Sequence, residues 1–142
     1  MHHSSLCKAV IAGVLSITAH AWAQTSVGLG RVDYKDNCAS CHGVSGQGDG
    51  PMRSFLVKPP SDLSTIAQRH GGQFPQDLIW EMVDGRWAEE VGPHGSREMP
   101  VWGNVFKQRA MTQPGDSEST AAWSSHNRIV SLLMYLESLQ KP

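Results

Sequence analysis

Apolar residues recur at helical spacing in two stretches of the chain. The later stretch predicts an amphipathic terminal helix beginning near Ser125. The earlier stretch predicts a helix that starts near Pro75 and stops at Gly85, since proline favours a first turn and glycine favours the position after a last turn. The residues expected to face the core are Ile129, Leu132, Leu133, Leu136 and Leu139 in the terminal helix and Leu78, Ile79, Met82 and Val83 in the earlier one.

Shorter helical segments are predicted upstream. One covers residues 28–37, and another covers residues 63–69, with Ser61 or Asp62 as its cap and Gly71 and Gly72 as its stop. Residues 43–51 are rich in glycine and predict a loop, while residues 111–124, rich in Thr, Ser, Gly and Pro, predict a flexible surface insertion. Polar and apolar residues never alternate over a sustained run, so we expect an all-α chain of about four short helices with long loops.

The N-terminus has the pattern of a secretory signal peptide. Lys8 precedes eleven apolar or small residues from Ala9 to Ala19, and Ala21-Trp22-Ala23 forms an A-x-A cleavage site. A membrane-spanning helix needs about 20 apolar residues, so this run is too short for an anchor. We therefore expect residues 1–23 to be a cleavable signal peptide, residues 24–142 to form one domain, and the mature protein to be periplasmic, without a membrane span.

The net charge limits the kinds of binding partner, and the number of cysteines limits the possible disulfides. The formal net charge is −1 and becomes −2 when Lys8 leaves with the leader. Charges of both signs are scattered, which disfavours nucleic acid and anionic membranes as partners. Cys7 also leaves with the leader, so two cysteines remain, and we expect no disulfide in spite of the oxidising compartment.

The two remaining cysteines lie in a C-x-x-C-H motif made of Cys38, Cys41 and His42, which is the signal for covalent attachment of c-type haem. Each thiol can add to one vinyl group of the same porphyrin, and the following histidine becomes an axial ligand of the iron. We therefore predict one haem c, attached through Cys38 and Cys41, with His42 as a metal ligand.

Two other interpretations of the cysteine pair fit the sequence less well. A structural zinc site would need a second pair of ligands at a similar spacing, and Cys7 lies in the leader. A thioredoxin-like dithiol would open a helix within an α/β pattern, which the chain does not show.

The chain resembles the class I c-type cytochromes, which are small exported monohaem electron carriers. The resemblance rests on the haem motif with Gly30 and Tyr34 before it, on the segment around Tyr135, and on Met99-Pro100-Val101-Trp102. It implies a cytochrome c-like fold around one haem, in which the terminal helix crosses the first helix at Gly30. It also implies that Met99 is the second axial ligand, and that a proline carbonyl, from Pro51, Pro59 or Pro60, accepts a hydrogen bond from His42.

Other residues compete for roles near the iron. His94, in a glycine-flanked loop five residues before Met99, is the rival ligand, while His70 and His126 adjoin predicted helix ends and receive no role. Trp102 and Arg97 are candidates for contacts with the haem edge or a propionate, with ordinary packing and an exposed charge pair as the alternatives. Trp80 and Trp87 are expected to serve in packing. The rival methionines Met52, Met82, Met111 and Met134 lie on predicted core faces, close to the haem motif or in the polar insertion.

The expected function is one-electron transfer in a periplasmic chain, with no substrate turned over. The partners are a donor dehydrogenase or reductase and an acceptor oxidase or second cytochrome. A haem subunit docked on an exported dehydrogenase is one alternative. The other is an open-site haem sensor or peroxidase, which would use His94 and Arg97 if Met99 did not bind iron. We expect the protein to be a monomer or a subunit of a redox complex.

Overall fold

The computed structural model describes residues 25–85, 99–112, 115 and 117–142. The predicted leader, Trp87, His94 and Arg97 lie outside these residues. The described chain contains helices and turns and no strand, which confirms the all-α prediction. After a helix over residues 25–37, the elements are α2 (Ala39–His42), the 3-10 turns η1 (Pro51–Phe55) and η2 (Leu63–Thr65), α3 (Ile66–Arg69), α4 (Gln76–Asp84), α5 (Trp102–Ala110) and α6 (Glu118–Ser138).

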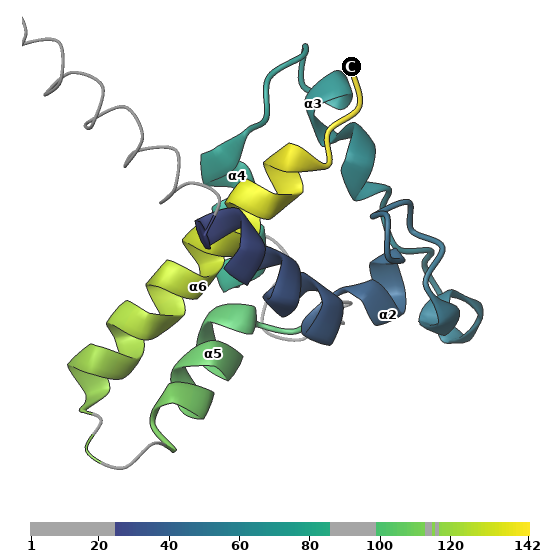
Figure 1. Ribbon diagram of the computed structural model, residues 1–142. Helices are drawn as coiled ribbons and strands as arrows, with labels where there is room; N and C mark the ends of the chain where they lie inside the picture. The colour runs from purple at the N-terminus through teal and green to yellow at the C-terminus, as the bar shows by residue number, and fades with distance from the viewer. Residues whose placement is uncertain (1–24, 86–98, 113–114, 116) are drawn as a thin grey trace, which may run out of the picture.

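The 25–37 helix crosses α6 at a point where only glycine fits. Figure 1 shows the first helix, in purple, crossing α6. A Cβ atom placed on Gly30 would lie 1.9 Å from the backbone oxygen of Ser131, so the two backbones are in direct contact. One turn further on, the rings of Tyr34 and Tyr135 pack with their centroids 5.3 Å apart. The expected crossing at Gly30, with Tyr135 as the partner aromatic, is therefore confirmed.

The core lies where these two helices meet α4 and α5. It is formed by Tyr34, Ile66, Ile79, Val83, Phe106, Ile129, Leu132, Leu133 and Leu136. Met82 was predicted to face this core, but its side chain is exposed, because Ile79 and Val83 already cover the buried side of α4. Gly85 ends α4 in the left-handed conformation with φ 98°, as predicted.

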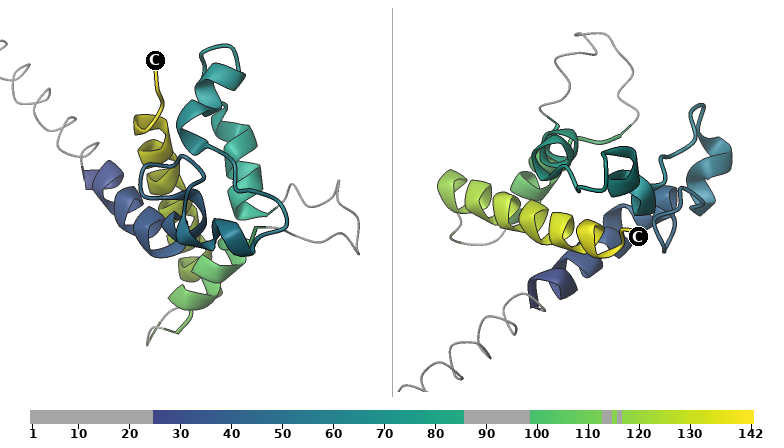
Figure 2. Two further views of the ribbon diagram at one scale, coloured as in Figure 1. Left: turned by 90° about the vertical axis from the view of Figure 1, so that its right-hand side faces the viewer. Right: turned by 90° about the horizontal axis from the view of Figure 1, so that it is seen from above.

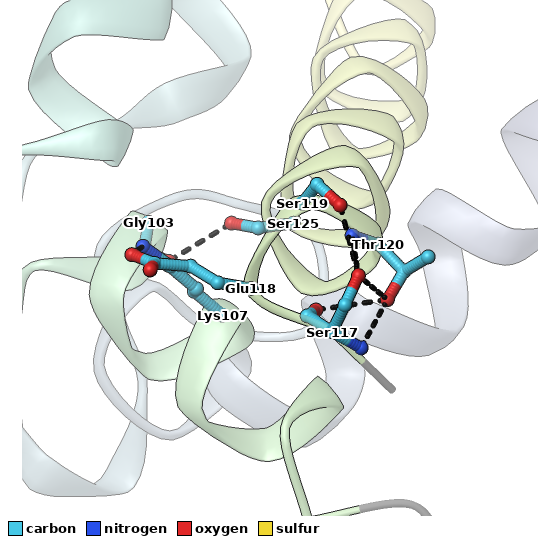
Figure 3. A network of polar contacts seen from close by, with 7 residues as sticks. All are labelled: Gly103, Lys107, Ser117, Glu118, Ser119, Thr120 and Ser125. Atoms are coloured by element: carbon cyan, nitrogen blue, oxygen red, sulfur yellow. Dashed lines mark hydrogen bonds and ion pairs between the residues drawn. The ribbon is translucent and has the colours of Figure 1, made fainter. Parts of the chain in front are cut away.

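The terminal helix begins at Glu118, seven residues before the predicted start. Ser117 and Thr120 form a capping box in which each side-chain oxygen accepts a hydrogen bond from the backbone N–H of the other residue. Lys107 forms an ion pair with Glu118 across the α5–α6 turn (Figure 3). Ala121 is fully buried in this first part of α6. The prediction of a flexible insertion is therefore wrong for residues 118–124, which are helical.

A half-buried ion pair joins the 25–37 helix to α6. Arg128 donates to both carboxylate oxygens of Asp33, with Nε at 3.1 and 3.2 Å, and its guanidinium lies 4.4 Å from the ring centroid of the buried Phe106. Figure 2 shows α5 running alongside α6. Because Phe106 belongs to α5, the contacts of Arg128 connect the 25–37 helix, α5 and α6. Among the described residues, no helix has both the length and the apolar character needed to cross a bilayer.

Candidate functional site

The C-x-x-C-H motif occupies a single helical turn. Cys38 is the N-cap of α2, and its carbonyl accepts hydrogen bonds from the backbone N–H groups of Cys41 and His42 at 3.1 and 2.9 Å. Positions i, i+3 and i+4 of a helix lie on one face. The turn therefore presents two half-buried free thiols and one imidazole to the same side.

The His42 ring is held by the backbone of a distant segment. Its Nδ1 lies 3.0 Å from the carbonyl oxygen of Ser61. A carbonyl can only accept, so this contact assigns the proton to Nδ1 and leaves the Nε2 lone pair available to a metal ion. The prediction that Pro51, Pro59 or Pro60 supplies this acceptor is therefore wrong.

The path of residues 60–63 explains why Ser61 supplies it. The backbone N–H of Leu63 donates to the Gly46 carbonyl at 2.6 Å, which fastens this segment to the loop after the haem motif. A Cβ atom on Gly48 would lie 2.4 Å from the Pro60 oxygen, so glycine is required for this approach. The proline carbonyl faces Gly48, and the carbonyl one residue later reaches His42.

Asp62, the residue after Ser61, holds the 60–63 segment in place through its own hydrogen bonds. Its carboxylate accepts hydrogen bonds from the hydroxyl and backbone N–H of Ser64 at 2.6 and 2.8 Å, and these bonds lower the pKa of Asp62. Arg69 donates to the Asp62 carbonyl at 2.8 Å. The cap itself was predicted, but the role of Ser61, Asp62 and Arg69 in holding His42 was not, because it depends on how two loops meet.

The environment of Cys38 argues against a redox dithiol. Burial and, to a smaller extent, the nearby Asp33 carboxylate raise the pKa of Cys38 to about 12. Thioredoxin-like motifs need a thiol with a lowered pKa, because the thiolate is the nucleophile. The zinc interpretation also lacks ligands, since no cluster of three or more His, Cys, Asp or Glu side chains able to hold a metal occurs in the described part of the chain.

Tyr34 connects the helix crossing to the haem motif. Its buried hydroxyl donates to the Gly43 carbonyl at 2.7 Å, directly after His42, and burial raises the pKa of this tyrosine. Gly43 itself has φ 80°, a conformation that favours glycine. The neutral Tyr34 therefore stabilises the turn by which the chain leaves the haem motif.

Met99 lies beside the same core as Cys38. It is half-buried and packs against the core cluster that Cys38 and Ala39 also contact. Its position is set by α5, which begins three residues later. A Cβ atom on Gly103 would lie 2.2 Å from the Asp84 carboxylate, so the start of α5 sits directly on the end of α4.

The rival ligands are placed less favourably where they are described. Three of the other methionines, Met52, Met82 and Met111, are exposed, and Met134 is half-buried on α6. The exposed His126 packs its ring against Trp80 at 4.6 Å, and His70 is also exposed. Trp80 and Trp102 both pack against the core, and Trp102 also contacts Phe106 at 5.7 Å.

This set of donor atoms fits haem c. Two free thiols on one helical face suit two thioether bonds, and an imidazole with a free Nε2 and a half-buried thioether are the usual axial ligands of low-spin c-type haem. Met99 packs against the buried apolar cluster, an environment that suits a porphyrin face.

Comparison with known proteins agrees with this chemistry. The family model for cytochrome c matches residues 28–104, which is more than half of the chain and includes the haem motif and Met99. Neither the curated proteins nor the solved structures give a match. The family carries covalently bound haem c and transfers electrons to and from redox partners. The chain therefore belongs to the cytochrome c family, whose function is haem-based electron transfer.

Proposed function

We propose that this protein is an exported one-electron carrier of the periplasm, with one haem attached through Cys38 and Cys41 and with His42 and Met99 as the axial ligands. One observation supports this most directly. The Ser61 carbonyl holds Nδ1 of His42, so Nε2 is free to bind iron on a turn whose first cysteine packs against the same core as Met99.

When bound, haem c supplies an iron centre that accepts and releases one electron. The hydrogen bond to Ser61 fixes the orientation of the His42 ring and makes its free nitrogen a better donor. A thioether is a neutral and soft ligand, so Met99 favours reduced over oxidised iron and raises the reduction potential. If His42 and Met99 both bound the iron, the protein would leave no open position there for a substrate.

Export is part of the proposal. The apolar run and the A-x-A sequence before Gln24 support cleavage after Ala23 and export of the mature chain. The protein would then meet its donor and acceptor in the periplasm.

The test uses protein produced with its leader and purified from the periplasm of a bacterium that attaches haem c. We expect an intact mass that corresponds to residues 24–142 plus one haem, haem that resists acid–acetone extraction, and a reversible one-electron titration. A variant with both Cys38→Ala and Cys41→Ala should lose the covalent haem. Cys7→Ala is the matched control and should retain it, because Cys7 lies in the predicted leader. Haem that is extracted from the wild type would contradict the proposal.

A further inference from the structure

A hollow of about 360 Å³ lies between α4 and α6, and we call it the α4–α6 hollow. None of the residues that line it belongs to the haem motif, to the loop after the motif or to the 60–63 segment. The side chains that line it include Gln76, Asp77 and Trp80 of α4 and His126, Val130 and Met134 of α6.

The turn of each helix places the α4–α6 hollow away from the core. On α4, Ile79 is buried in the core, and Trp80 follows it about 100° further round the helix. On α6, Ile129 is fully buried, whereas Val130, also about 100° further round, is 39% exposed. Cys38 packs against the core cluster, and Figure 1 shows α2 to the right of α4 and α6. We therefore expect the α4–α6 hollow to stay open to solvent when haem is attached to Cys38.

Two aromatic rings form one wall of the α4–α6 hollow. The ring centroids of Trp80 and His126 lie 4.6 Å apart, with an angle of 49° between the ring planes. Trp123 lies one turn before His126 on the same face of α6, and its side chain is 72% exposed. Exposed tryptophan beside a partly apolar hollow is typical of a surface that contacts another protein.

The charges around the α4–α6 hollow are negative. Asp77 lines it, and Gln76 donates a hydrogen bond to the exposed Glu137 carboxylate at 3.0 Å, which holds this second acid beside the rim. The sequence of α4 contains no lysine or arginine. The single arginine of α6, Arg128, donates to Asp33 of the 25–37 helix and does not line the hollow. An occupant with a positive charge is therefore favoured.

We propose that the α4–α6 hollow receives an arginine side chain of a protein partner. A guanidinium group is a planar cation, which can stack on an indole ring while the N–H groups at its edge donate to a carboxylate. Trp80 and Asp77 provide these two groups three residues apart on one face of α4. The exposed Trp123 extends the contact along α6, since tryptophan and arginine dominate the energetics of protein interfaces.

This inference goes beyond the proposed function and does not depend on how the iron is ligated. A partner attached at the α4–α6 hollow would leave the turn of Cys38 to His42 free, because that turn contributes no residue to the hollow.

The test titrates isotopically labelled, reduced, haem-loaded protein with the peptide acetyl-Leu-Arg-Leu-amide and follows the N–H signals by NMR. The matched peptide carries citrulline in place of arginine, which keeps the shape of the side chain and removes its charge. The protein variants are Asp77→Asn and Val130→Lys. Glu81→Gln is the control variant, because it removes the same charge from α4 as Asp77→Asn and Glu81 does not line the hollow.

We expect the arginine peptide to shift the indole N–H signal of Trp80 and the backbone N–H signals of His126 and Val130, with saturation. Citrulline, Asp77→Asn and Val130→Lys should each raise the dissociation constant about tenfold. Glu81→Gln should leave it within about twofold of the wild-type value.

Four results would overturn the proposal. The first is the absence of saturable shifts at Trp80, His126 and Val130. The second is equal binding of the citrulline peptide by the wild type, a comparison that needs no variant to fold. The third is a changed haem absorption spectrum in Asp77→Asn or Val130→Lys, which would place the hollow beside the haem. The fourth is dimerisation of the wild type in sedimentation that Val130→Lys abolishes, since a second copy of the chain would then be the occupant.

Discussion

Replacing Gly30 with alanine tests the helix crossing that holds the two ends of the described chain together. The added Cβ atom would lie 1.9 Å from the Ser131 oxygen and 2.5 Å from its carbonyl carbon. Both are backbone atoms of α6, so no side chain can move aside to make room. To restore an ordinary contact of about 3.4 Å, the helices must separate by about 1.5 Å.

Two effects of opposite sign decide the outcome. Alanine stabilises a helix interior by about 1 kcal/mol relative to glycine. Overpacking in a dense core costs about 1–3 kcal/mol, and separation of these helices also loosens the packing of Tyr34 and Leu132, which are at most 1% exposed. The backbone clash leaves little freedom for relaxation, so we expect a net loss of about 2 kcal/mol in the free energy of unfolding.

Urea unfolding of the haem-loaded protein, followed by circular dichroism, measures this loss. Gly28→Ala is the matched control in the same helix, because no atom lies within 4 Å of a Cβ atom at position 28. It should raise the free energy of unfolding by about 0.5–1 kcal/mol. The reasoning is refuted if Gly30→Ala is as stable as the wild type or is stabilised like Gly28→Ala.

Three further predictions concern local hydrogen bonds. Tyr34→Phe removes the buried bond to Gly43 and should cost about 1–2 kcal/mol in urea unfolding; an unchanged midpoint would contradict its role. Asp62→Ala should cost about 1 kcal/mol at neutral pH. Because the bonds from Ser64 lower the pKa of Asp62, this stabilisation is present above the usual value of about 3.9 and is lost as the pH falls through the lower folded value. The unfolding curves of wild type and variant should converge in acid, and a gap independent of pH would disprove this origin. Ser117→Ala should accelerate amide hydrogen exchange in the first turn of α6, and Ser124→Ala should not; equal exchange in both would exclude the capping box.

The start of α6 shows what apolar periodicity can and cannot reveal. From Ile129 onward the core residues are large and regularly spaced, and the helix there was predicted. The first part of α6 buries small residues, Ala121 and Ser125, and leaves Trp123 exposed, so no apolar stripe marks it. The available signal was the spacing of Ser117 and Thr120, which is typical of a helix cap.

The candidate site also contains residues that the sequence identified and one that it did not. Cys38, Cys41 and His42 could be identified from sequence because their spacing alone determines the chemistry of attachment. The Ser61 acceptor could not, because it depends on the contacts of Gly46 with Leu63 and of Gly48 with Pro60. A shift of one residue along this segment changes which carbonyl reaches the imidazole, and only the folded chain sets that register.

Axial ligation by Met99 is the central claim, and the absorption spectrum of oxidised, haem-loaded protein tests it most directly. A methionine bound to ferric haem gives a weak charge-transfer band at long wavelength. We expect this band in the wild type and in Met111→Ala, which removes a methionine that is 51% exposed, and we expect Met99→Ala to abolish it. A band that persists in Met99→Ala, or that is absent from the wild type, would contradict His42–Met99 ligation.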